Sequence, residues 1–287
     1  MKVLVFGKTG QVAQELARRA GDITLDVCGR DEADFADPES CVRLVRETDA
    51  DAVINAVAYT AVDKAEEEED IARVVNGTTP GAIARACAER DLPFVHISTD
   101  YVFDGSGQTP FVPDHPTSPL GAYGRSKLKG EEEVRAAGGR YAIFRTSWVV
   151  SSHGGNFVKT MLRLGAERDA LTIVADQVGG PTCAADIADT CLAAAGQLAA
   201  NPDKSGIYHL SGGPDVSWAD FAREIFRLSD TDCAVTDIPS SDYPTPAKRP
   251  LNSRLDNSQT EATFGLPRPD WRAGLKDILR DLGALST

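Results

Sequence analysis

Short apolar runs alternate with helix-like segments through the first half of the chain, and this alternation restricts the fold more than any other feature. The runs typical of strands are residues 3–6, 23–28, 52–57, 94–98 and 141–146. The helix-like segments between them are residues 11–20, 38–45, 80–90 and 126–136. This pattern predicts an α/β fold, with a doubly wound parallel sheet covered by helices on both faces. Functional residues are then expected just after each strand, because ligands of such sheets bind beyond the strands' carboxyl ends.

The first strand is followed by Gly7-Lys-Thr-Gly10-Gln-Val-Ala13, which opens the first helix. Gly7 permits a sharp turn, Gly10 lets a pyrophosphate approach the backbone, and Ala13 is small enough for close packing of helix on sheet. The amides at the helix N-terminus then face the phosphates. A glycine after a strand is often only a turn, but at the start of a strand–helix series this motif indicates a dinucleotide site. We therefore predict a modified Rossmann fold that binds NAD(P).

Beyond about Ser147 the alternation is less regular. Residues 181–200, 218–228 and 270–282 predict helices, the second with Ser217 as its N-cap. Prolines recur between Pro239 and Asn252, which indicates a shaped loop. We predict that residues 1–150 form the NAD(P)-binding Rossmann domain. Residues 151–287 are predicted to form mainly a smaller C-terminal substrate-binding lobe, with some segments returning to the Rossmann domain.

The charge and the cysteine content argue against several functional classes. The net charge is −13 and no basic patch is visible, so nucleic-acid binding is not expected. No apolar run reaches the roughly 18 residues of a membrane span and no leader precedes the first strand, so we expect a cytoplasmic protein without membrane attachment. The six cysteines form no CxxC pair and no histidine stands at metal-ligand spacing from them, which predicts buried free thiols.

The segment after the second strand bears on the choice of cofactor. Arg30 lies where the adenine ribose of a dinucleotide is expected and suits a 2′-phosphate, whereas Asp26 or Asp31 could hold a 2′-hydroxyl. A surface arginine without this role is the alternative. Asp34 and Phe35 follow a few residues later and could frame an adenine ring. The expected cofactor is therefore NADPH or NADH.

Two segments carry a candidate catalytic set. Thr99 lies just past the fourth strand, and Tyr123 and Lys127 stand four residues apart, so on a helix they share one face. A lysine ammonium near a phenol lowers the pKa of the phenol, which we expect to make Tyr123 a proton donor near neutral pH. A tyrosine–lysine pair at this spacing is commonly a surface pair. The strand-end threonine upstream, in a chain with a dinucleotide motif, favours the catalytic interpretation.

With these motifs in place, the chain resembles the extended short-chain dehydrogenase/reductase superfamily. The matching motifs span nearly the whole chain, at residues 6–12, 58–66, 98–103, 123 with 127, 144–148, 156–157 with 159–162, 176–177 with 180–182, and 243–250 with 252–253. Within the superfamily the resemblance is to reductases of nucleotide-linked 4-dehydro sugars. It implies NAD(P)H-dependent reduction of the C4 ketone of dTDP-4-dehydro-L-rhamnose to dTDP-L-rhamnose.

The resemblance also implies roles for residues of this chain. Contacts with the dinucleotide are implied for Gly10, Gln11, Val12, Arg30, Asp34, Phe35, Ala58, Tyr59, Thr60 and Ile97, beside Gly7 of the turn. Thr99, Tyr123 and Lys127 would form the catalytic set, with Tyr123 and Lys127 also touching the cofactor. Contacts with the sugar nucleotide are implied for Thr99, Asp100, Tyr123 and Trp148. Asn156 and Arg249 are further candidates for the substrate, because Arg249 could pair with a diphosphate.

Departures from the family pattern leave some points open. Some members are dimers bridged by magnesium through glutamates; Glu15 matches one such position, but Ala185 stands where another glutamate would be needed. We therefore expect no metal and either a monomer or a homodimer. An epimerase with permanently bound NAD and a regulatory subunit that binds nucleotide without turnover remain alternatives. The intact catalytic set argues against the second, and Asp100-Tyr101 lacks the Asp-Glu pair of a dehydratase.

Overall fold

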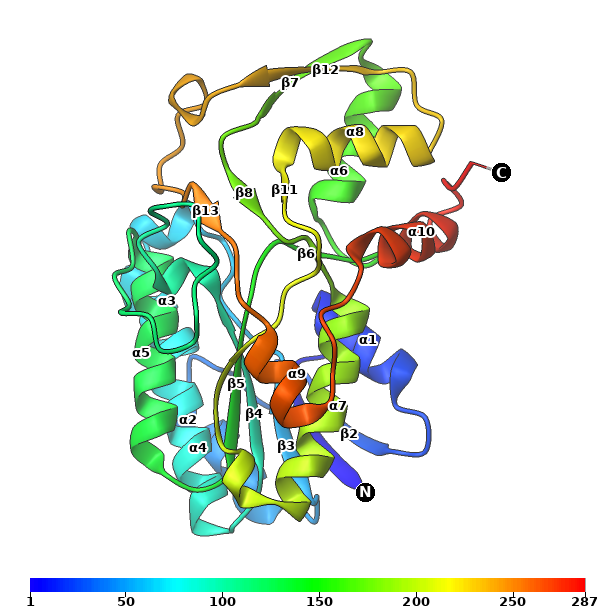
Figure 1. Ribbon diagram of the computed structural model, residues 1–287. Coiled ribbons are helices and arrows are strands. Elements are labelled where there is room, and N and C mark those ends of the chain that lie inside the picture. The colour runs from blue at the N-terminus through cyan, green and yellow to red at the C-terminus, as the bar shows by residue number, and fades with distance from the viewer. Residues whose placement is uncertain (287) are drawn as a thin grey trace.

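The computed structural model describes residues 1–286 and is built around a six-stranded parallel sheet (Figure 1). Its strands are β1 (Lys2–Phe6), β2 (Thr24–Cys28), β3 (Ala52–Asn55), β4 (Phe94–Thr99), β5 (Tyr141–Thr146) and β10 (Gly206–His209). Their spatial order is β10-β5-β4-β3-β1-β2, and every neighbouring pair is parallel. The predicted doubly wound sheet is confirmed. Because the strand order reverses between β1 and β3, a ligand crevice is expected beyond their carboxyl ends.

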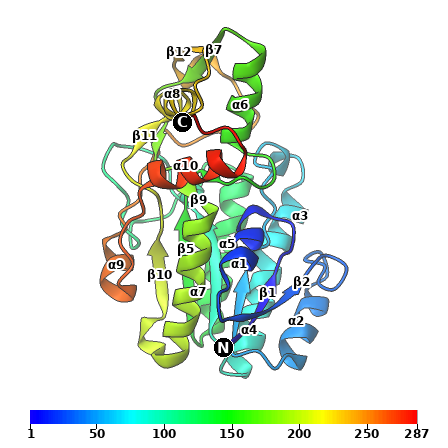
Figure 2. The same ribbon diagram turned by 90° about the vertical axis from the view of Figure 1, so that its right-hand side faces the viewer.

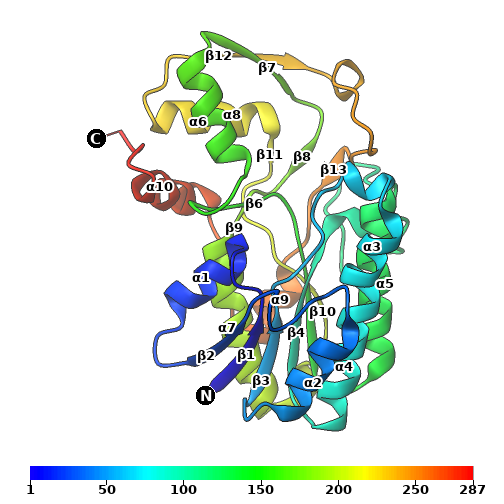
Figure 3. The same cartoon turned by 180° about the vertical axis from the view of Figure 1, so that it is seen from behind.

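Helices cover both faces of this sheet (Figures 2 and 3). One face carries α1 (Gln11–Arg19), α7 (Ala184–Ala200) and α9 (Ser258–Phe264). The other carries α2 (Pro38–Glu47), α4 (Thr79–Glu89) and α5 (Ala122–Ala137). Successive strand residues point to opposite faces, so Val5 of β1 packs towards α7 whereas Leu4 and Phe6 pack towards α2 and α4. Burial on both faces is why these strands read as continuous apolar runs.

A smaller unit lies beyond the carboxyl ends of the large sheet (Figure 1). Its elements are the parallel pair β7 (Ala170–Val174) and β12 (Ala234–Ile238), with α6 (Phe157–Glu167), α8 (Trp218–Leu228) and α10 (Trp271–Asp281) packed against each other and the pair. One apolar cluster joins them, built on Phe221, Ile225, Trp271 and Leu275. The unit therefore has a core of its own.

Short strands and short helical segments complete the fold. The short strands β6 (Val149–Val150) and β9 (Thr182–Cys183) form a two-stranded sheet. A three-stranded sheet has β8 (Val178–Gly179) at its centre, between β11 (Val216–Ser217) and β13 (Asn252–Ser253). Short helical segments are α3 (Glu69–Arg73), η1 (Lys64–Glu66), η2 (Val74–Thr78), η3 (Asp100–Val102), η4 (Pro202–Lys204) and η5 (Ser240–Asp242). The proline-rich region after residue 239 is mainly irregular, as predicted.

The sequence pattern located most elements of the large sheet to within a few residues. In the second half it located α7, α8 and α10, and Ser217 caps α8 as predicted, since its Oγ accepts a hydrogen bond from the Asp220 amide at 3.0 Å. The pattern did not indicate α6, β7, β10 or β12. β7 and β12 are short and partly exposed, so they lack a continuous apolar run. The six cysteines are buried and unpaired, as predicted.

The chain after residue 150 does not remain in the smaller unit. α7, β10 and α9 lie on the large sheet although they follow that residue (Figure 2). The division into residues 1–150 and 151–287 stays a prediction. Across residues 1–286, each helix is too short or too polar to cross a membrane.

Candidate active site

The glycine turn after β1 fits a dinucleotide. Gly7 has a φ of 114°, and a Cβ there would lie 3.3 Å from the carbonyl group of Ala56. A side chain would therefore be both strained and crowded. Gly10 is the N-cap of α1 and offers no side chain to the first amides of the helix. Those amides, with Gln11 and Val12 in the first turn, can accept a pyrophosphate.

A hydrogen-bond network joins this turn to the start of α6. Gln11 Oε1 accepts from Ser151 Oγ at 2.8 Å and from Asn156 Nδ2 at 3.0 Å. Asn156 Nδ2 also donates to the Ser151 carbonyl oxygen at 2.7 Å, and Asn156 Oδ1 caps α6 by accepting from the Lys159 amide. The sequence predicted a substrate contact for Asn156. That contact stays a prediction; in the structure the Asn156 amide is hydrogen-bonded within the chain and helps to hold Gln11.

The residues expected around the adenosine lie beyond β2. The Arg30 side chain is 84% exposed, and its Nε lies 3.8 Å from Asp34 Oδ1, so the guanidinium is only loosely held. Phe35 is buried and meets Phe6 edge to face, with ring centroids 5.7 Å apart. Arg30 is therefore available to a phosphate, and Phe35, packed on Phe6, leaves only 4% of its surface for contact with a nucleotide.

The loop after β3 carries Ala58, Tyr59 and Thr60, and Asn76 of η2 shapes it. Asn76 Oδ1 accepts from the Tyr59 amide at 2.8 Å, while its Nδ2 donates to the Tyr59 carbonyl oxygen at 3.0 Å and to Ser126 Oγ on α5 at 2.9 Å. Asn76 is fully buried. It ties the predicted cofactor loop to the helix that carries the catalytic pair. Sequence reasoning did not find it, because an isolated asparagine has no pattern.

The structure brings the predicted catalytic residues to one place. Thr99 ends β4, and Tyr123 and Lys127 lie one turn apart at the start of α5. The Tyr123 ring stands perpendicular to that of Tyr101, with centroids 5.5 Å apart. α5 can come this close because residue 124 is glycine: a Cβ there would lie 2.2 Å from the Tyr101 carbonyl oxygen.

Lys127 is held by the strand beside it. Its side chain is 1% exposed, and its Nζ donates to the Ile97 carbonyl oxygen at 2.6 Å. Burial lowers the pKa of Lys127 to about 8, against the opposing effect of the Glu131 carboxylate. Lys127 is therefore a buried cation that gives up its proton more easily than an exposed lysine.

The pKa of Tyr123 differs from the sequence-based expectation. Burial raises it above its ordinary value of 10, which a hydrogen bond with Thr99 only partly opposes, and the charge of Asp100 raises it further. The predicted lowering is wrong for this structure, because burial of the phenol dominates and Lys127 makes no resolved contribution to the Tyr123 pKa. Tyr123 consequently keeps its proton to high pH and is suited to donate it.

Asp100 is a buried acid beside the catalytic threonine. It is 3% exposed, and its Oδ1 accepts from Thr99 Oγ1 at 3.0 Å. Its Oδ2 is buried without a hydrogen-bond partner among residues 1–286. Burial raises the pKa of Asp100 to about 6, although the side chains of Ser253 and Thr99 and the backbone at residues 100 and 101 oppose the rise; the Ser253 hydroxyl is near Asp100 without meeting hydrogen-bond geometry at Oδ2. A buried, half-paired carboxyl group of this kind is typical of a functional site.

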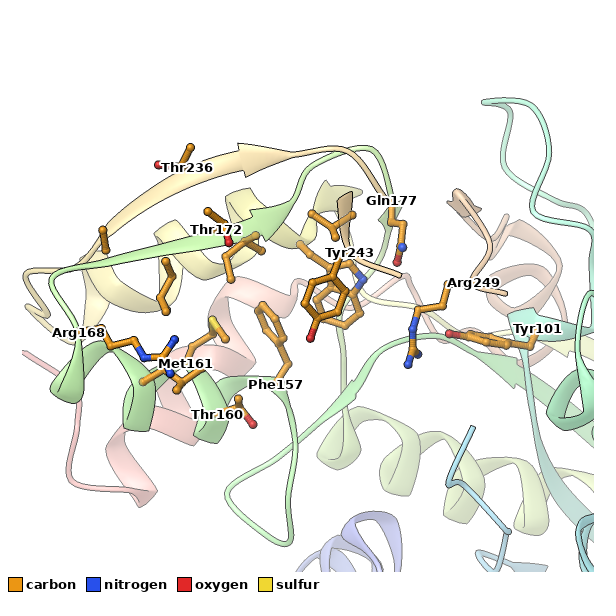
Figure 4. Close-up of a pocket in the computed structure, with 16 residues that line it drawn as sticks. Tyr101, Phe157, Thr160, Met161, Arg168, Thr172, Gln177, Thr236, Tyr243 and Arg249 are labelled. Carbon is orange, nitrogen blue, oxygen red and sulfur yellow. The ribbon is translucent and has the colours of Figure 1, made fainter. Parts of the chain in front are cut away.

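A cavity of about 570 Å³ opens next to this group, between α6, α8 and the β7–β12 pair. Tyr101, which packs on Tyr123, and Arg249 lie at one end, Arg168 lies at the other, and Phe157 and Tyr243 lie between them (Figure 4). The cavity thus adjoins the catalytic residues but does not contain them. Its apolar walls with an arginine at each end can accept a flat ring system and an anion.

Two tryptophans stand between the catalytic end of β5 and the cavity. Trp148 has a φ of 49°, which is strained for a bulky residue, and its ring stacks on that of Trp218 with centroids 3.6 Å apart. Trp218 is the first residue of α8 and lines the cavity. The sequence indicated Trp148 but not Trp218. The tilted ring of Phe157 extends the aromatic cluster, with its centroid 4.5 Å from that of Trp218.

Glu15 stands at a position where some family members have a magnesium-binding glutamate, and its carboxylate contacts other side chains of this chain. Glu15 is 4% exposed; its Oε1 lies 3.0 Å from His153 Nε2 and 3.4 Å from an Arg18 nitrogen. Over the described part of the chain, no three His, Cys, Asp or Glu side chains are grouped so as to hold a metal ion. Ala185, at the start of α7, adds no ligand.

Comparison with known proteins identifies the family. A family model described as the RmlD substrate binding domain matches residues 1–284. A dTDP-4-dehydrorhamnose reductase from Shigella flexneri is 44% identical over 294 residues, covering 98% of this chain and 98% of the relative. The chain belongs to the dTDP-4-dehydrorhamnose reductase family.

Solved structures of this family have the same architecture. A dTDP-4-dehydrorhamnose reductase from Clostridium acetobutylicum is 36% identical with a TM-score of 0.92, covering 99% of this chain and 100% of that one. Another, from Bacillus anthracis in complex with NADP, is 31% identical with a TM-score of 0.90, covering 98% of this chain and 99% of that one. The resemblance predicted from the motifs is thereby confirmed.

Proposed function

We propose that this protein reduces the C4 ketone of dTDP-4-dehydro-L-rhamnose to dTDP-L-rhamnose, using NADPH or NADH. The observation that carries the proposal is the position of Thr99, Tyr123 and Lys127, between a turn that fits a dinucleotide and a cavity that fits a nucleotide. The names of the relatives and the NADP in one family structure support the same reaction.

We assign a role to each of the three catalytic residues. Bound NADPH supplies the hydride. Tyr123 donates its proton to O4 of the sugar, since its raised pKa keeps the phenol protonated. Thr99 hydrogen-bonds the same carbonyl oxygen, and Lys127, with its ammonium between α5 and β4, holds the nicotinamide ribose.

The cofactor would lie along the carboxyl ends of β1 to β4. Its pyrophosphate would face Gly7, Gly10 and the first amides of α1, including those of Gln11 and Val12. The further proposed contacts are those of Arg30, Asp34 and Phe35 with the adenosine, and of Ala58, Tyr59, Thr60 and Ile97 beside the catalytic pair.

The sugar nucleotide would extend from the catalytic residues into the cavity. Arg249 would pair with the diphosphate, although in this structure its Nη2 lies 2.7 Å from Asp63 Oδ2, so that contact must be shared or exchanged. Asp100 and Trp148 would contact the sugar, and the apolar walls would receive the nucleobase. We further propose that the protein acts in the cytoplasm, as a monomer or a homodimer.

The test is an NADPH-oxidation assay with dTDP-4-dehydro-L-rhamnose, alongside the UDP- and GDP-linked counterparts. We expect consumption of one NADPH per dTDP-L-rhamnose formed. In the same assay, Tyr123→Phe removes the proposed proton donor. Tyr141→Phe is its matched control, since it also removes a tyrosine hydroxyl but Tyr141 begins β5, at the opposite end of the sheet. Interconversion of sugars without net NADPH consumption would favour an epimerase, and binding without turnover would favour a regulatory subunit.

A further inference from the structure

One buried cluster of charged side chains beneath the catalytic residues has no part in the proposed reaction. Glu131, Arg145 and Ser98 are 1%, 3% and 3% exposed. Arg145 forms a bidentate ion pair with Glu131: Nε donates to Oε1 at 3.0 Å, and Nη2 donates to Oε2 at 2.7 Å. Ser98 Oγ donates to Glu131 Oε1 at 2.5 Å, and Arg145 Nη1 donates to the Pro113 carbonyl oxygen at 2.9 Å. Both buried charges are therefore paired and hydrogen-bonded.

A buried ion pair is weak evidence for a stabilising role, because the loss of hydration offsets the attraction and apolar residues often serve as well. Its location suggests another role. Tyr123, Lys127 and Glu131 follow one another at intervals of four along α5 and share a face. On β4, Ser98 stands between Ile97, whose carbonyl oxygen binds Lys127, and Thr99. Through Ser98, the cluster therefore holds the end of β4, which carries both the carbonyl group that binds Lys127 and the catalytic Thr99.

We propose that Glu131, held by Arg145 and Ser98, is a positioning residue that keeps the Lys127 ammonium charged and seated on the Ile97 carbonyl oxygen for cofactor binding. This inference rests on the proposed function. It assigns an electrostatic task to an ion pair that would otherwise only join α5 to β5.

Loss of the Glu131 charge and loss of the Arg145 charge should have opposite effects on the pKa of Lys127. Burial lowers the pKa of Lys127 to about 8, and Glu131 opposes this. If Glu131 loses its charge, the Arg145 cation remains unbalanced nearby, and the ammonium form of Lys127 is disfavoured. If Arg145 loses its charge, the Glu131 carboxylate remains and the ammonium form is favoured. A purely structural role would give both losses the same effect.

Other groups around Lys127 do not titrate in the same range. His96 on β4 is neutral, because burial holds its pKa well below the ordinary value. Asp100 on η3, with a pKa of about 6, is ionised above neutral pH, and the phenols of Tyr123 and Tyr101 are protonated because burial raises both pKa values. Further charged groups around α5 are Glu66 of η1, whose Oε1 accepts from the Ala122 amide, and the outward ion pairs of Glu69 with Arg125 and of Glu133 with Arg85 and Lys129.

The test measures the dissociation constant of NADPH by fluorescence across neutral and alkaline pH. In the unmodified protein the affinity should fall as pH passes the Lys127 pKa of about 8. Glu131→Gln should move this midpoint to lower pH by about one unit, as expected when a neighbouring opposite charge is lost, and Arg145→Met should move it to higher pH by a smaller amount. The double variant carries neither charge, so its midpoint should lie between that of Glu131→Gln and that of the unmodified protein.

Two further variants separate charge from packing. Glu131→Asp keeps the charge and Ser98→Ala removes only a hydrogen bond, so both should leave the midpoint nearly unchanged. Thermal unfolding identifies variants that do not fold. If Glu131→Gln fails to fold, Arg145→Met and the double variant still test the proposal, because the double variant leaves no unpaired buried charge.

The two hypotheses fail in different ways. Midpoints that stay in place, or that move in the same direction in both single variants, would overturn the role of Glu131. A midpoint that persists in Lys127→Met would do the same, because Lys127 would not be the titrating group. Absence of NADPH binding in the unmodified protein would instead contradict the proposed function.

Discussion

Replacing Asp100 by asparagine should stabilise the protein at neutral pH and impair its reaction. The carboxyl group is 3% exposed, with one oxygen bound by Thr99 and the other without a well-formed hydrogen bond within residues 1–286, although the Ser253 side chain lies near enough to favour the charged form. Burial raises its pKa from 3.8 to about 6. Asparagine has nearly the same shape, can still accept the Thr99 hydrogen bond, and carries no charge.

The expected gain in the free energy of unfolding follows from the difference between the pKa values of Asp100 in the folded and unfolded states. Between pH 3.8 and about 6 the folded protein binds a proton at Asp100 that the unfolded chain releases, so stability falls as pH rises through this window. With 1.36 kcal/mol per pKa unit, the ionised carboxylate costs at most about 3 kcal/mol at pH 8. The same relation leaves about half of that penalty at pH 5 and almost none at low pH.

The assay is urea unfolding of both proteins at several pH values. Asp100→Asn should have the larger free energy of unfolding at pH 8, and the difference should shrink steadily towards pH 5. Turnover should fall, because the residue that binds Thr99 no longer carries charge. A stability difference that does not depend on pH, or a less stable variant at pH 8, would refute the reasoning that ionised Asp100 is a buried, poorly compensated charge.

Three further predictions concern the site. Tyr123→Phe should lower kcat by about 10²–10⁴, the usual contribution of a general acid, with NADPH binding nearly intact; a variant that keeps a tenth of the activity would show that the proton comes from elsewhere. Arg30→Ala should raise the KM for NADPH more than that for NADH, because the exposed guanidinium pairs with the 2′-phosphate; equal changes would remove Arg30 from this role. A chelator should leave both activity and oligomeric mass unchanged, since Ala185 stands where a second carboxylate would be needed beside Glu15; a loss restored by Mg²⁺ would overturn this.

The sequence predicted the large sheet well because each of its signals is local. Strands buried on both faces read as apolar runs, and the residues of the glycine turn are adjacent in the chain. The same reasoning failed for β7 and β12, which are half exposed and pair across about sixty residues of chain. It also failed for the pKa of Tyr123, because burial is set by segments distant in sequence.

The candidate site divides in the same way. The spacing of Tyr123 and Lys127 made them neighbours on one helix face, and Thr99 could be placed because it ends a strand. By contrast, no spacing indicates that Asn76 ties the β3 loop to α5, that Trp218 stacks on Trp148, or that Asn156 is engaged by Gln11.

For this protein the sequence by itself determined the strand–helix order, the glycine turn and the catalytic residue types, because these depend on interactions among near neighbours in the chain. Only the tertiary structure decided which charges are buried and what compensates them. Asp100 is left half paired, whereas Glu131 meets Arg145 from another element. The physical reason is that hydration and charge pairing depend on everything within a few ångströms of a group, and folding brings those neighbours from distant parts of the chain.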